Sequence, residues 1–133
     1  MPITFDLKPD QQLIIFRHID DVPDVEFLTF YQHFFENVWT ANYMNLLIDL
    51  KHTNSMARSS QALQSLAELL RERLTDKMGS SRVAVVAPTD LSFGLARMYE
   101  VFSDCIPKEF FVFRSGDDAC AWLGVTSNLE ASG

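Results

Sequence analysis

The stretch "SRVAVVAPTDLSFGLARMYEVF", residues 81–102, decides the fold of this 133-residue chain. Its apolar run at 82–87 is nearly continuous, which is typical of a strand covered on both faces of a parallel sheet. The residues "PTD" then turn the chain into a helix, and a strand that runs directly into a helix is the repeating unit of α/β domains. The spacing predicts that this helix turns toward the core a stripe formed by Leu91, Leu95, Met98 and Phe102.

Strand and helix patterns alternate in the same way along the rest of the chain. Two strands, at 3–7 and 12–18, flank the turn residues of 8–10, which predicts an antiparallel hairpin. The other predicted strands cover 43–50, 82–87 and 109–114. The other predicted helices cover 25–39, a segment from Ser59 or Ser60 to near 79, and 115–125. We therefore predict an α/β fold with an N-terminal β-hairpin followed by strand-helix repeats in a mostly parallel, five-stranded sheet.

Length and charge limit the classes of protein to which this chain can belong. We expect one domain at 1–125 and a flexible C-terminal tail at 126–133. The net charge of −7 argues against nucleic-acid binding, which needs a basic stripe to contact phosphates. The sequence has neither a signal-peptide pattern nor 18 consecutive apolar residues, so we predict a cytoplasmic protein with no membrane insertion.

No motif for a cofactor or for catalysis is found. A dinucleotide-binding turn needs three glycines, whereas the opening stretch has only Gly94, for which we expect a role in close packing. Thr89 or Asp90 is expected to cap the helix that follows. Cys105 and Cys120 have apolar neighbours and are expected to be buried rather than reactive. We therefore predict a protein that is not an enzyme and binds no cofactor or metal.

One polar site remains as a weaker hypothesis. Ligands of open parallel sheets bind at the carboxyl ends of the strands, where loop residues gather. The residues predicted to line such a crevice are His18, Asp20, His52, Thr53, Thr89 and Ser115. Histidine and aspartate side chains can bind a metal ion or transfer protons, but these histidines lack a known metal-binding spacing.

The predicted helix at 25–39, "VEFLTFYQHFFENVW", is apolar over an unusually wide arc. Such an arc must bury a second surface in addition to its contact with the sheet. Three explanations are open: a neighbouring helix, a partner subunit, or the wall of a cavity for an apolar ligand. The candidate interaction surface consists of Phe27, Phe30, Tyr31, Phe34, Phe35, Trp39 and, on a later helix, Arg97. Arg97 pairs either with Glu100 or Asp104 on its own helix or across a dimer interface.

The last 45 residues or so carry a family resemblance. It rests on Gly94, Ala96, Arg97, Met98, Glu100, Val112, Phe113, Ser115, Asp118, Ala119, Trp122 and Leu123. With these residues the chain resembles the uncharacterised bacterial branch of the SpoIIAA-like family, also described as STAS/SEC14-type domains. The resemblance implies a SpoIIAA-like fold. It also implies one of two roles: anti-sigma-factor antagonists bind a partner kinase and are switched by serine phosphorylation, whereas SEC14-type domains carry lipids in an apolar cavity.

The antagonist motif can be compared with this chain residue by residue. Asp49 and Leu50 match the strand end of the motif, and Ser59 and Ser60 match its two serines, which makes them candidate phospho-acceptors. The other explanation for Ser59 is that it caps a helix. We predict a non-enzymatic, SpoIIAA-like protein that acts as a protein-interaction or regulatory module and is a homodimer. The alternative is a small carrier of an apolar ligand or lipid.

Overall fold

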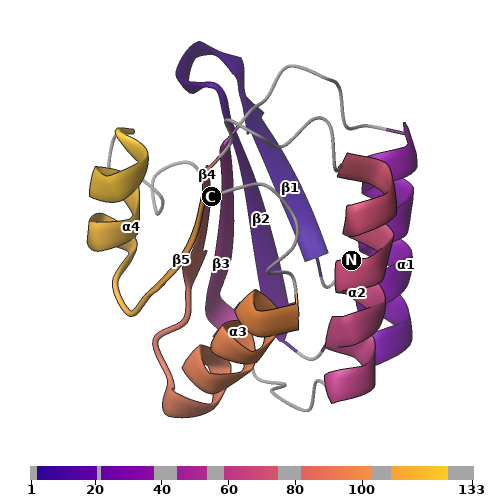
Figure 1. Cartoon of the computed structure of the whole chain (residues 1–133). Coiled ribbons are helices and arrows are strands. Elements are labelled where there is room, and N and C mark those ends of the chain that lie inside the picture. Colours follow the sequence, from indigo (N-terminus) through magenta and orange to yellow (C-terminus); the bar gives the residue numbers. More distant parts are fainter. Residues whose placement is uncertain are drawn as a thin grey trace.

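A five-stranded sheet lies between helices on both of its faces in the computed structural model of the chain (Figure 1). The structure describes residues 3–20, 22–37, 45–53, 59–74, 82–102 and 109–125. The predicted tail at 126–133, Trp39 and Cys105 lie outside these ranges, as does the predicted end of the second helix near residue 79.

The strands lie side by side in the order in which they occur in the sequence. They are β1 (Ile3–Lys8), β2 (Leu13–Asp20), β3 (Asn45–Thr53), β4 (Arg82–Val86) and β5 (Glu109–Phe113). The first two form the predicted antiparallel hairpin, in which Phe5 is opposite Phe16, and a short 3-10 helix at Pro9–Gln11 makes the turn. The other neighbouring strands pair in parallel. The predicted fold class is therefore confirmed.

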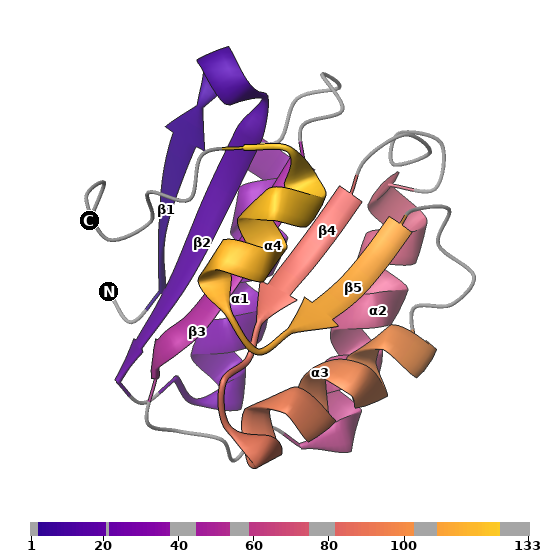
Figure 2. The same cartoon turned by 90° about the vertical axis from the view of Figure 1, so that its left-hand side faces the viewer.

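Helices of the described residues follow or connect the strands. They are α1 (Asp24–Asn37), α2 (Ser60–Leu74), α3 (Asp90–Phe102) and α4 (Gly116–Leu123). The two largest apolar clusters occupy opposite faces of the sheet: one contains residues of α1, α2 and α3, and the other contains residues of α4 (Figures 1 and 2). Strands covered on both faces need apolar residues at successive positions, which is why 82–87 is a nearly continuous apolar run. Within the described residues, no helix combines the length and apolar character that crossing a membrane requires.

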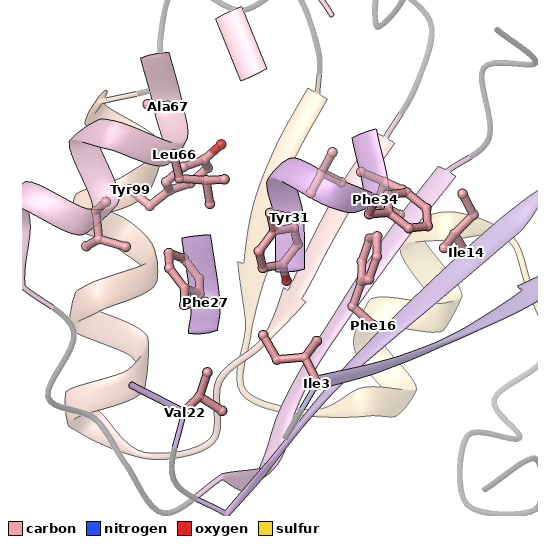
Figure 3. Close-up of a cluster of buried hydrophobic side chains, with 13 residues drawn as sticks. Ile3, Ile14, Phe16, Val22, Phe27, Tyr31, Phe34, Leu66, Ala67 and Tyr99 are labelled. Atoms are coloured by element: carbon pink, nitrogen blue, oxygen red, sulfur yellow. The ribbon is translucent and has the colours of Figure 1, made fainter. Parts of the chain in front are cut away.

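The aromatic arc of α1 is largely buried inside the chain. Phe27, Tyr31 and Phe34 are buried, and they belong to the cluster that contains Phe16 of β2 (Figure 3). The helix contacts α2 on its other side, so a neighbouring helix provides the second buried surface. The prediction that these three residues form an exposed interaction surface is therefore wrong. Phe30 is partly buried in the same cluster, and the side chain of Phe35 is outside the described part of the structure.

The predicted core stripe of α3 is wrong at two of its four positions, and the side chain of Phe102, its last member, is outside the described part of the structure. The residues that this helix buries are Ser92, Ala96 and Tyr99, whereas Leu91 and Met98 are exposed. Ala96 packs with Val85 of β4 and Val112 of β5. Small side chains at the contact allow the helix axis to approach the sheet closely, and the larger aliphatic residues then lie on the outside. Leu95 is at the boundary between the two sides and packs against the core.

Candidate functional site

The residues predicted to line a polar crevice do not form one site. His18 is buried beneath α1, where its Nε2 lies 2.8 Å from the hydroxyl of Tyr31. His52 is exposed on β3 and is the register partner of Ile19. The pairing of β2 with β3 is irregular between Arg17 and Ile19, so strand alternation does not fix the face on which His52 lies. The two histidines differ in burial, since one lies in the core and the other at the surface.

The other crevice residues hydrogen-bond at the ends of elements. Thr53 Oγ1 donates to the carbonyl of Asp20 at 2.6 Å, which joins the ends of β3 and β2. Thr89 Oγ1 accepts from the backbone N–H of Ser92 at 3.1 Å and so caps α3, as the sequence suggested. Ser115 Oγ accepts from the backbone N–H of Asp117 at 3.1 Å and caps α4. Across the described segments, no three histidine, cysteine, aspartate or glutamate residues form a group that would hold a metal ion.

Ser59 lies at the beginning of α2, and its hydroxyl has two partners. Its Oγ accepts from the backbone N–H of Ala62 at 3.1 Å and donates to Asp24 Oδ2 at 2.8 Å. The hydroxyl therefore caps the helix and connects it to the first turn of α1. A phosphate on this serine would be adjacent to the carboxylate of Asp24, which would repel it. The side chain of Ser60 is outside the described part of the structure.

We expect Ser59→Ala to lower the free energy of unfolding by about 1 kcal/mol, because the mutation removes the acceptor that caps α2. Ser59→Asn is the matched control, since asparagine caps helices about as well as serine. Urea unfolding followed by circular dichroism measures both variants. Equal losses in the two variants would show that the cap is not the source of the effect.

Cys120 of α4 is buried in the apolar cluster between this helix and the sheet. Burial raises the pKa of its thiol, and the nearby carboxylate of Asp117 raises this pKa further. The thiol therefore stays protonated near neutral pH and does not resemble a catalytic thiolate.

A row of charged residues that the sequence pattern did not predict lies on the face of the sheet that bears α4. Arg17 of β2 is buried and forms an ion pair with Asp6 of β1. Asp49 of β3 is the register partner of Arg17, and only 2% of its surface is exposed. Its Oδ1 accepts from the backbone N–H of Lys51 at 2.9 Å. Asp6 occurs in a strand that alternates in polarity and Arg17 follows an apolar run, and only the pairing of the hairpin shows that they meet.

Apolar side chains are exposed along the outward side of α3. We call this side the outer α3 face; it consists of Asp90, Leu91, Gly94, Arg97, Met98 and Val101. The exposed fractions are 57% for Leu91, 39% for Met98 and 72% for Val101. Arg97 Nε lies 3.2 Å from Glu100 Oε1, one of the two intrahelical partners that the sequence suggested.

A second exposed apolar group lies at the edge of the sheet. Phe111 of β5 is 54% exposed, and its ring centroid lies 5.4 Å from that of Phe113 and 5.8 Å from that of Trp122 on α4. The guanidinium of Arg82 lies over the Trp122 ring, 5.3 Å from its centroid. Phe111 is thus surrounded by partly buried neighbours, whereas the outer α3 face has several exposed aliphatic residues along one helix.

Comparison of the sequence with models of known protein families finds no match, and comparison with curated proteins finds none either. The fold is similar to that in the crystal structure of an uncharacterised protein of the DUF3478 family with a SpoIIAA-like fold, from Shewanella loihica PV-4. The two chains superpose with a TM-score of 0.55 over 91% of each chain, at 19% sequence identity. This similarity confirms the predicted SpoIIAA-like fold.

Proposed function

We propose that this protein is a non-enzymatic regulatory module that acts by binding other protein chains, and that it forms a homodimer. The observation that carries the proposal is the outer α3 face, where Leu91, Met98 and Val101 are exposed on one helix. Contiguous exposed apolar surface is uncommon on monomers and marks sites of protein contact.

The arrangement of α3 supports a role in binding more than a role in packing. This helix turns its small residues Ser92 and Ala96 to the core and leaves longer aliphatic residues outside. Burying one exposed leucine or valine side chain on association is worth about 1.5–3 kcal/mol. A partner that covers this face would gain part of that free energy, because the side chains are already partly buried and association costs translational and rotational freedom.

The polar groups also favour a binding module over an enzyme. Thr89 and Ser115 cap helices, and His18 is buried against Tyr31. Each of these side chains has a structural role in a place where an enzyme would need a free catalytic group. The SpoIIAA-like fold is compatible with this function but does not specify it.

Size-exclusion chromatography with light scattering tests the proposal. We expect the molar mass to rise with concentration toward twice the 15.2 kDa of the single chain. Val101→Lys should keep the mass at that of one chain, and Val25→Lys is the control, because Val25 is equally exposed on α1. A wild-type protein that remains monomeric at the highest attainable concentration would contradict the proposal.

A further inference from the structure

Gly94 lies in the middle of α3, where a glycine costs about 1 kcal/mol relative to alanine. A Cβ built at this position would meet no atom of the described residues within 4 Å. The prediction that Gly94 permits close packing inside the chain is therefore wrong. A glycine with open space beside it is explained if the backbone of another molecule approaches it closely.

The residues around Gly94 carry opposite charges on its two sides. Asp90 is four positions before the glycine, and Arg97 is three positions after it. These spacings place the two charged side chains on the same side of the helix as the glycine. The side chain of Asp90 is 99% exposed and that of Arg97 is 60% exposed.

We propose that α3 packs antiparallel against α3 of a second copy of this chain, with the two Gly94 residues at the crossing. This proposal rests on the proposed function, because it names the partner that covers the outer α3 face. Two-fold symmetry makes each contact occur twice, so Arg97 of each copy faces Asp90 of the other. A parallel arrangement would instead place Asp90 opposite Asp90.

The ion pairs that Arg97 and Asp90 form within the chain do not prevent them from pairing with a second copy. Arg97 pairs with Glu100, which is partly buried, and Asp90 pairs with Arg114, where both side chains are exposed. Exposed ion pairs contribute about 0–1 kcal/mol, so shifting them toward a second copy costs little. Charge pairs at the rim of an interface set its orientation more than its affinity.

The size of the surface indicates a weak dimer. A stable interface buries about 800 Å² on each partner, and one face of a single 13-residue helix offers less. We therefore expect a micromolar or weaker dissociation constant, so the experiments must cover the range from about 1 μM to about 1 mM.

Charge reversal tests the antiparallel arrangement. Arg97→Asp and Asp90→Arg each create two like-charge contacts in their own homodimers, so we expect each variant alone to dimerise at least about tenfold more weakly than the wild type. In a mixture of the two variants, both contacts again join opposite charges. Light scattering should then show a dimer in the mixture, and circular dichroism of each variant checks that it is folded.

Gly94→Ala provides a second test, in which stability and dimerisation change in opposite directions. The variant should raise the midpoint of thermal unfolding by about 3 °C, measured at a concentration where the monomer dominates. It should weaken dimerisation about tenfold, because the added methyl groups separate the two helices. A variant that only disturbed folding would lower the midpoint instead.

Phe111→Ala is the matched control, since it removes an exposed apolar side chain from the edge of the sheet.

Recovery of the dimer in the mixture of the two charge-reversal variants supports the proposal. If the wild type dimerises and the charge-reversal variants do so equally well, or the mixture does not recover, the antiparallel α3 contact is wrong while the proposed function stands. If the wild-type protein never dimerises, both the antiparallel α3 contact and the proposed function are wrong.

Discussion

Replacing Phe16 by alanine is expected to lower the free energy of unfolding by about 4 kcal/mol, a large part of the 5–15 kcal/mol that stabilises a typical domain. Phe16 is 0% exposed. Its ring centroid lies 4.8 Å from that of Phe34 and 5.3 Å from that of Tyr31 (Figure 3). The mutation removes these contacts and a third with the ring of Phe30, at 5.9 Å, and leaves a cavity between β2 and α1.

Phe5→Ala is the matched control for this prediction. Phe5 is the register partner of Phe16 on β1 and also contacts Phe34, with 5.1 Å between the ring centroids, but it is 37% exposed. Its loss should therefore be smaller, about 1–2 kcal/mol. Guanidinium unfolding followed by tryptophan fluorescence and circular dichroism measures both variants. Similar losses in the two variants would contradict the central position of Phe16 in the core.

The sequence was sufficient to predict the strands, the hairpin and a mostly parallel, five-stranded sheet. Each of these features depends on local patterns, such as the apolar run at 82–87 and the turn residues of 8–10. The right-handed connection of parallel strands then restricts how such units assemble. The structure confirms the hairpin and the mostly parallel sheet, and it adds the β1-β2-β3-β4-β5 order, which the sequence had not predicted.

The sequence could not show which side of each helix is buried, because this depends on tertiary contacts. Periodicity located an apolar stripe on α3 but could not show that the smaller Ser92 and Ala96 would face the sheet. On α1, a buried surface was predicted to be exposed. The wide apolar arc of this helix indicated a second contact, and only the position of α2 shows that this contact is inside the chain.

For the same reason, the candidate interaction surface in the structure is on a different helix from the predicted one. The sequence placed the interaction surface on α1, with Arg97 as a separate addition. The structure buries Phe27, Tyr31 and Phe34, and it places Arg97 on a helix face that also carries Met98 and exposed Gly94. A helical projection of 90–102 could have found this grouping, but it could not have shown which side of the helix faces the solvent.

Arg17→Met is expected to lower the free energy of unfolding by about 3 kcal/mol, the upper end of what a hydrogen bond to a charged group contributes, because most of the Arg17 side chain is buried. The side chain of Arg17 is 11% exposed, and that of Asp6, its partner, is 39% exposed. The buried carboxylate of Asp49 lies at the register partner of Arg17 on β3. The mutation therefore removes the partner of Asp6 and a positive charge on the strand next to Asp49.

The position of Arg17 between two strands predicts unequal effects for its neighbours. Asp6→Asn should cost only about 1 kcal/mol, because water can solvate the half-exposed side chain. Arg17→Lys keeps the charge but loses the planar guanidinium, so its loss should fall between those of the other two variants. A double-mutant cycle of Arg17→Met and Asp6→Asn, measured by urea unfolding, isolates the coupling of the pair. If Arg17→Met proves as stable as the wild type, the charged row contributes nothing to folding, and the sheet is held by its apolar faces alone.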